Sequence, residues 1–178
     1  MKCISFAHQD EYIDNDGLVF KNNFHVVFCP KYKRPVLKEG IAKRLSYILY
    51  AEAQKMRQFI QHGSTSTYDH CESVAQLSFW LNRRLKLRAE ERELIRAAFL
   101  HDFYLYDWHV PDGSHRLHGF SHPHTAAENA KRVFGISGSE AEDIESHMWP
   151  LTITKLPRRR EGWIICLADK ICAIREII

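Results

Sequence analysis

The amino-acid sequence predicts an all-α fold, a bundle of about five to seven helices preceded by a short irregular or β-prone segment. Three observations lead to this prediction. Apolar residues recur at intervals of three and four from residue 40 onward, Ser, Gly and Pro mark the ends of the periodic stretches, and no alternating run requires a strand after residue 40. The 178 residues suffice for one domain with a sizeable core.

The composition is that of a globular protein without signs of export. Hydrophobic residues make up 45% of the chain and charged residues 26%, and a net charge of +3 is too small to indicate a nucleic-acid or membrane partner. The five cysteines are widely spaced and form no CxxC pair, which argues against a disulfide framework and a thiolate zinc site. No apolar run has the length of a leader peptide or a membrane span. We therefore predict a cytoplasmic protein without a membrane partner.

The first 39 residues form a predicted N-terminal extension ahead of a domain that spans residues 40–178. Residues 1–23 carry no clear period, whereas FHVVFC at 24–29 is prone to form a strand. Residues 24–37 resemble the opening strand of small insertion-sequence transposases that use a catalytic tyrosine. The His-apolar-His metal strand that those enzymes require next is missing, so we do not expect a nucleic-acid partner.

Helical periodicity begins at Gly40. It predicts one long amphipathic helix that continues to Phe59, followed by a loop at 63–67 that is rich in helix-capping Ser and Thr. A second helix is predicted to continue to Leu85, with His70 in its first turns.

The third predicted helix starts near Ala89 with an acidic first turn and ends at His101. A His-rich loop at 107–120 follows, and loops of this composition commonly line sites. We expect Ser121 to cap a fourth helix and Gly135 to end it.

Two further helices complete the predicted bundle. One begins at a Ser137 cap and ends at His147, and the last spans residues 161–178 and is apolar on nearly all sides. Asp169 lies inside this last helix, so its carboxylate is expected to project into the protein interior. A buried carboxylate requires a partner, which is either a salt bridge or helix cap in another element or a metal ion.

His101 and Asp102 lie side by side in AAFLHDF, where burial of the pair requires hydrogen bonds or a metal ion. With His70 in YDHCESVA and Asp169 in ICLADK, they form an ordered set that resembles the defining pattern of the HD superfamily of metal-dependent phosphohydrolases. The resemblance covers roughly residues 56–178. It implies an HD-domain helical bundle in which these four side chains hold a metal ion between helices.

Two more histidines extend the resemblance to a second metal ion. In HPHTAAENA the register matches best with His122 as the ligand, and His124 is the competitor. In IESHMW the family has one or two adjacent histidines, but Met148 follows His147 here. The resemblance therefore implies that Asp102 bridges two cations and that the second one keeps an open or solvent-filled position.

The resemblance implies hydrolysis of a phosphate ester or anhydride in a nucleotide or another small phosphorylated metabolite. Asp102 is the expected catalytic residue, because two cations that share it would also share a water and make metal-bound hydroxide available near neutral pH. One or two divalent ions are expected, and the mixed ligands suit Fe, Mn, Co, Ni or Zn better than Mg. The apolar end at Ile177 and Ile178 leaves a homodimer open.

Tyr104, Tyr106 and Trp108 stand where many members of the superfamily have Gly and Lys. For these three aromatic side chains we favour a role in core packing over a role as a platform for a nucleobase. Basic side chains near the ligand segments are the candidate substrate contacts, with a solvated or structural role as the alternative for each: His62, His115, His118, His124, Arg158, Arg159, Arg160 and Lys170.

Two other functions stay open. The same ligand pattern resembles the di-iron oxygenases built on this fold, and an intact site without turnover would make the protein a nucleotide-binding sensor module. Activity with redox-inert Zn or Mn under anaerobic conditions would exclude the oxygenase. Tight binding without turnover would indicate the sensor.

Overall fold

The computed structural model describes residues 11–13, 19–21, 51–110, 113 and 117–177. The chain divides into two compact units, Met1–Tyr50 and Ala51–Ile178.

In the first unit, β1 (Glu11–Ile13) pairs antiparallel with β2 (Val19–Lys21), and Tyr12 lies opposite Phe20. The strand predicted at 24–29 lies outside the described residues, as do the basic run after it and the start of the helix predicted from residue 40.

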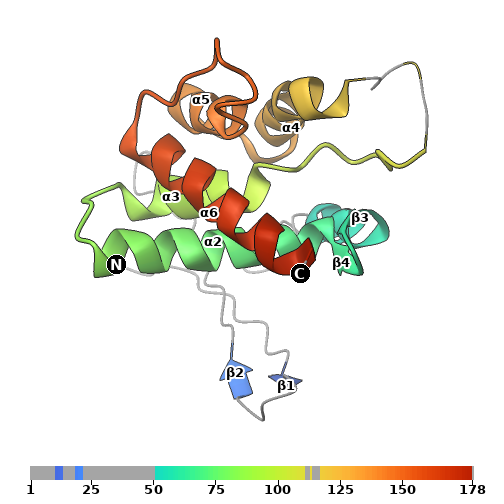
Figure 1. The fold of residues 1–178 in the computed structure, drawn as a ribbon, viewed down its shortest axis with the longest axis horizontal. Helices are drawn as coiled ribbons and strands as arrows, with labels where there is room; N and C mark the ends of the chain where they lie inside the picture. Colours follow the sequence, from blue (N-terminus) through green and yellow to red (C-terminus); the bar gives the residue numbers. More distant parts are fainter. Residues whose placement is uncertain (1–10, 14–18, 22–50, 111–112, 114–116, 178) are drawn as a thin grey trace, which may run out of the picture. The chain divides into compact units, whose positions relative to one another are not determined.

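The second unit is helical, which confirms the predicted all-α class. Its helices in chain order are α2 (Thr67–Arg84), α3 (Glu91–Leu100), α4 (His118–Phe134), α5 (Gly138–Ser146) and α6 (Arg160–Ile177). Helix α2 packs against α3 and α6, while α4 packs beside α5 (Figure 1). In the described part of the chain, no helix combines the length and the apolar character that crossing a membrane requires.

A short hairpin precedes α2 and corrects two predictions. The predicted helix does not reach Phe59, which is extended, and strands do occur after residue 40. Gly63 has a φ of 55°, a left-handed conformation that suits glycine in a tight turn, and the backbone N–H of Thr67 closes the hairpin on the Phe59 carbonyl at 2.8 Å. The described segment before α2 consists of a helical turn at residues 51–54, the 3-10 helix η1 (Lys55–Gln58) and the two strands of the hairpin, β3 (Ile60–His62) and β4 (Thr65–Ser66).

Several helix ends are fixed by the local signals that the sequence predicted. Ser66 caps α2, and Ser137 caps α5 through a reciprocal pair of hydrogen bonds in which Glu140 also takes part. Gly135 ends α4 with a left-handed φ of 59°.

Helix α4 begins earlier than predicted, at His118 instead of after Ser121. The Ser121 hydroxyl donates to the Leu117 carbonyl at 3.1 Å, which is a bond of the helix interior and not of a cap. As a result, His118 and His122 lie one turn apart on the same side of the helix.

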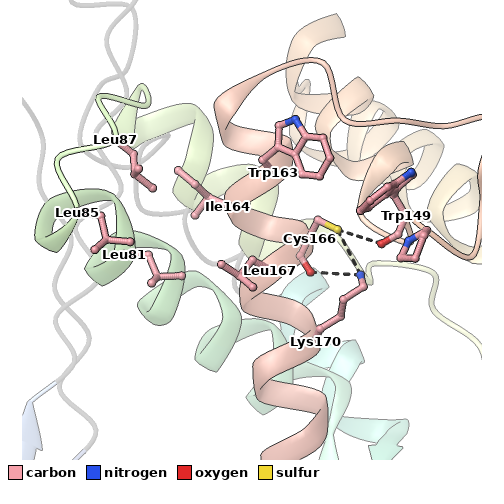
Figure 2. A pocket seen from close by; sticks show the side chains of 10 residues that line it. Leu81, Leu85, Leu87, Trp149, Trp163, Ile164, Cys166, Leu167 and Lys170 are labelled. Carbon is pink, nitrogen blue, oxygen red and sulfur yellow. Dashed lines mark hydrogen bonds between the residues drawn. The ribbon is translucent and has the colours of Figure 1, made fainter.

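An apolar pocket of about 350 Å³ lies where the end of α2 meets α6, lined by Leu81 on α2, Leu85 just after it, and Trp149, Trp163 and Leu167 (Figure 2). Lys170 lies at its edge and donates its ammonium protons to the carbonyl of Cys166 at 3.2 Å and to the Cys166 sulfur at 3.3 Å. The charged end of Lys170 is therefore held by protein acceptors.

The capping box of α5 leads to a first prediction. Replacing Ser137 by Ala should lower the free energy of unfolding by about 1 kcal/mol, because the backbone N–H of Glu140 loses its partner, the Ser137 hydroxyl. Urea unfolding followed by circular dichroism measures the change. Ser73→Ala is the control, since Ser73 is exposed and only bonds back to the Asp69 carbonyl within α2. Equal stability of the two variants would contradict the prediction.

Candidate metal centre

Polar side chains from five helical segments meet inside the second unit, with exposed fractions between 0% and 9%. The structure thus brings together all the residues that the sequence singled out as metal ligands. They are His70 on α2, His101 and Asp102 at the end of α3, His122 on α4, His147 at the end of α5 and Asp169 on α6.

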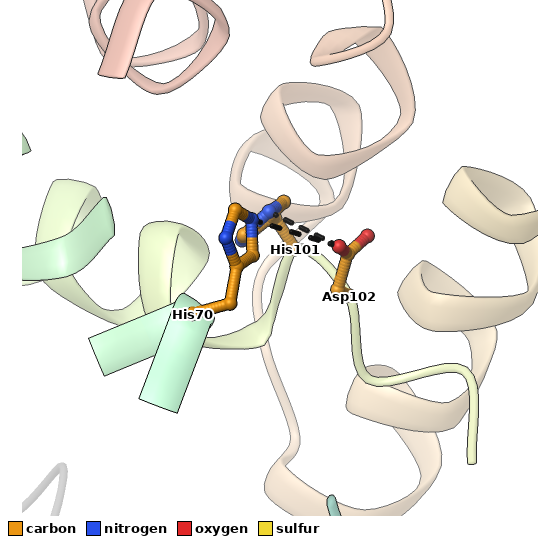
Figure 3. A group of neighbouring side chains, drawn as sticks. All are labelled: His70, His101 and Asp102. Carbon is orange, nitrogen blue, oxygen red and sulfur yellow. Dashed lines mark ion pairs between the residues drawn. The ribbon is translucent and has the colours of Figure 1, made fainter. Parts of the chain in front are cut away.

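Asp102 lies between two groups of histidines. Its Oδ2 atom is 3.4 Å from His101 Nε2 and 4.0 Å from His70 Nε2 (Figure 3). Its Oδ1 atom is 3.1 Å from His122 Nε2 and 3.6 Å from His147 Nε2. Each carboxylate oxygen therefore faces a different pair of imidazoles.

Asp169 completes the first of these groups. Its Oδ1 atom is 3.2 Å from His70 Nε2 and 3.7 Å from His101 Nε2. The first group thus consists of two imidazoles, Asp169 and one oxygen of Asp102. We call it the His70 group, and we call the second set, His122 and His147 with the other oxygen of Asp102, the His122 group.

The ring orientation of three histidines is fixed by main-chain carbonyls. A carbonyl only accepts hydrogen bonds, so the Nδ1 atom that meets it must carry the proton, and Nε2 keeps its lone pair for the interior. His101 and His147 directly follow the last residues of α3 and α5, so their rings lie close to carbonyls of the last helical turn. The bonds run from His101 to Ala98 at 2.8 Å, from His122 to His118 at 2.8 Å and from His147 to Ile144 at 2.7 Å.

Two observations show that this donor set fits a metal ion. The Nε2 atoms of His122 and His147 lie 3.0 Å apart with their lone pairs facing each other, an arrangement that a cation between them would stabilise. Moreover, His101 Nε2 and Asp102 Oδ1 are buried without a hydrogen-bond partner among the described residues. Imidazole and carboxylate are the ligand types that first-row divalent metals take.

The centre favours charged carboxylates and a neutral His147, whereas for His101 the effect of burial is outweighed by Asp102, which raises the pKa well above its usual value. Burial would raise the pKa of Asp102, but the neighbouring His101 and His122 hold it well below its usual range. Burial, with the nearby His101, lowers the pKa of His147 to about 3. Both groups are therefore in the ionisation state that a metal ligand requires at neutral pH.

Gln61 is a contact of the centre that the sequence analysis missed. Its side-chain N–H donates to Asp102 Oδ2 at 2.6 Å, and its carbonyl oxygen accepts from the hydroxyls of Tyr104 and, at 3.3 Å, Thr67. Gln61 reaches the site because it lies on β3, and no strand was predicted there.

Glu176 was missed as well, and its carboxylate lies 2.9 Å from His70 Nδ1. A signal for it exists in the sequence. Glu176 follows Asp169 by seven residues, which places both carboxylates on one face of α6.

Two of the candidate substrate contacts lie beside ligand rings. The His62 ring meets the His70 ring edge to face at 5.7 Å. The His118 ring stacks on the His122 ring at 4.5 Å, and its Nδ1 is 2.9 Å from the Tyr106 hydroxyl.

Lys170 contacts the centre through the main chain, because its ammonium donates to the His147 carbonyl at 3.0 Å. His124 and Arg158 do not join the buried group. They are exposed and pair with Glu145 at 3.2 Å and Glu142 at 3.5 Å, respectively. Substrate contact by all of these residues stays a prediction.

The other candidates have different surroundings. Arg159 forms an ion-pair cluster between helices with Glu93, Asp143 and Glu161. Arg160 donates a hydrogen bond to the Arg88 carbonyl at 3.4 Å. His115 lies outside the described residues. Tyr104 is buried, in agreement with the core-packing interpretation, whereas Tyr106 and Trp108 are half-buried.

The family model for the HD domain matches residues 67–174, which is well over half of the chain and includes every residue of the two ligand groups. The chain belongs to the HD domain family. Members of this family are generally metal-dependent hydrolases, in keeping with the buried His and Asp groups of this HD domain.

A second family model, for IS200-like transposases, matches residues 18–79, and much of that range lies outside the described residues. This match extends the resemblance seen at residues 24–37 in both directions, so the similarity is not a coincidence of one short run. None of the curated proteins that were compared matches the chain.

The shared position of Asp102 leads to a second prediction. Replacing Asp102 by Ala removes an oxygen from both ligand groups, so the affinity for each bound cation should fall by at least about tenfold. Metal analysis of the protein after dialysis measures the loss, and circular dichroism checks the fold. Asp107→Ala is the matched control, since this exposed carboxylate pairs with His109 at the surface. Equal metal content in both variants would show that Asp102 is not a ligand.

The pH dependence of metal binding gives a third prediction. Burial lowers the pKa of His70, but hydrogen bonds to Asp169 and Glu176 outweigh this and raise it to about 9. Below that pH the metal-free protein carries a proton that a cation must displace, so affinity should increase by up to about tenfold per pH unit from neutrality toward that pKa.

Calorimetric titrations in buffers of different ionisation enthalpy should show proton release near pH 7. A His70→Ala variant should release about one proton per chain less than the unmodified protein. Metal binding by the unmodified protein without proton release would contradict the prediction.

Proposed function

We propose that this HD domain protein is a metal-dependent phosphohydrolase that acts on a nucleotide or another small phosphorylated metabolite. The observation that carries the proposal is the placement of Asp102, whose two oxygens face separate groups of imidazoles. One carboxylate in this position suits a pair of cations. Divalent cations held there would lower the pKa of water toward neutrality and neutralise charge on phosphoryl oxygens.

The chain's own residues prepare this chemistry by orientation and burial. Gln61 fixes the carboxylate of Asp102, and main-chain carbonyls fix the rings of His101, His122 and His147. Because the ligands are almost fully buried, electrostatic attraction to a phosphoryl group is screened less than in water.

The proposed roles of basic residues follow from their contacts. The Lys170 ammonium donates hydrogen bonds to the His147 carbonyl and to the carbonyl and sulfur of Cys166. We therefore propose that Lys170 positions the end of α5. His62 and His118 lie beside ligand rings, and we assign to them contact with phosphate or with the leaving group.

The His118 ring also has an aromatic neighbour on the loop before α4. The half-buried Trp108 ring lies nearly parallel to the His118 ring, with an angle of 10° and a centroid distance of 5.2 Å. The Trp108 ring also packs against the His109 ring at 3.9 Å, so this stack leads from the partly exposed loop to His122.

A panel of nucleotides and phosphomonoesters tests the proposal. The metal-loaded protein should release phosphate or nucleotide product under anaerobic conditions with redox-inert Zn or Mn, and Asp102→Ala should fall to the level of buffer. Asp107→Ala should retain the activity, because Asp107 lies at the surface. If the protein turns over no substrate with any metal, or only in the presence of oxygen, the hydrolase proposal is wrong.

A further inference from the structure

His70 differs from the other three histidines of the centre in how its outer nitrogen is held. The Nδ1 atoms of the other three meet main-chain carbonyls, whereas His70 Nδ1 lies 2.9 and 3.0 Å from the two carboxylate oxygens of Glu176. We propose that Glu176 is a positioning residue that fixes His70 and makes the His70 group a tighter cation position than the His122 group. This inference rests on the proposed metal centre.

Helix α6 holds the His70 ring from both edges. Asp169 lies 3.2 Å from the inner nitrogen, Nε2, and Glu176 lies 2.9 Å from the outer nitrogen, Nδ1. Since the two carboxylates are two helical turns apart, one rigid helix supplies both contacts. With the Nδ1 proton donated to Glu176, the lone pair of Nε2 is directed at the position that Asp169 and Asp102 share.

Glu176 is largely enclosed by its surroundings. Its side chain is 11% exposed although it lies near the end of α6. The hairpin turn packs closely against the same residue, because a Cβ atom on Gly63 would lie only 3.2 Å from the Glu176 carbonyl oxygen. The hairpin that carries Gln61 to Asp102 therefore also contacts the residue that holds His70.

Charge makes the two groups unequal. A carboxylate partner makes an imidazole a stronger metal ligand than a neutral carbonyl does, and such outer partners typically change metal affinity by 10- to 100-fold. The His70 group combines the carboxylates of Asp169 and Glu176 with one oxygen of Asp102. The His122 group has the other oxygen of Asp102 as its acidic ligand among the described residues. A divalent cation is therefore expected to bind more tightly at the His70 group.

Titration of the metal-free, full-length protein with Mn²⁺ or Co²⁺ tests this inference. The variants His70→Ala and His122→Ala first identify which binding event belongs to which group. Glu176→Ala should weaken the cation that His70→Ala abolishes by about 10- to 100-fold, and Glu176→Gln, which keeps an acceptor without charge, by about tenfold. The cation of the His122 group should keep its affinity, and the Co²⁺ absorption spectrum of the His70 group should change.

Glu145→Gln is the matched control, because it removes the charge from a carboxylate–histidine pair of the same kind, with His124, at the surface. This variant should bind both cations as the unmodified protein does. If the Glu176 variants lower the thermal stability of the metal-free protein but leave both affinities unchanged, or weaken both cations equally, the inference is wrong and the metal centre stands. If the unmodified protein binds no cation, the proposed function itself fails.

Discussion

The burial of the Asp102 carboxylate is the constraint on which the rest of the second unit depends. Only 2% of this residue is exposed, and a carboxylate removed from water costs several kcal/mol unless other groups replace its hydration. An amide on β3 donates a hydrogen bond to this carboxylate, and imidazoles at the end of α3, on α4 and at the end of α5 lie 3.1 to 3.6 Å from its oxygens. The elements around Asp102 must therefore converge on one side chain.

Helix ends make this convergence possible. His101 and His147 stand at the ends of α3 and α5, where each ring bonds to the carbonyl three residues earlier, and the Ile144 carbonyl also accepts the backbone N–H of His147. One contact thus ties the ring to the end of its helix and fixes the orientation of an inward-facing imidazole. The hydrogen-bonding needs of the fold and of the candidate centre are met by the same atoms.

Local signals in the sequence predicted most of the fold and the inner residues of the centre. Ser137 and Gly135 mark helix ends by their own chemistry, and the ordered pattern from His70 to Asp169 is independent of loop geometry. Gln61 could not be predicted, because its position depends on a hairpin turn at Gly63 that a short, weakly periodic stretch does not reveal. The start of α4 was misplaced since Ser121 has the composition of a cap but bonds as an interior residue.

The two ligand groups also belong to different helix pairs. His70 and Asp169 lie on α2 and α6, which pack against each other, whereas His122 and His147 belong to α4 and the end of α5, which form a second packed pair (Figure 1). Asp102 contacts both groups from the end of α3. A cation in one group would therefore hold one helix pair to Asp102, and a cation in the other would hold the second pair to the same carboxylate. Since Glu176 adds its charge on the side of α2 and α6, our inference implies that a first cation would bind to that pair and a second one to α4 and α5.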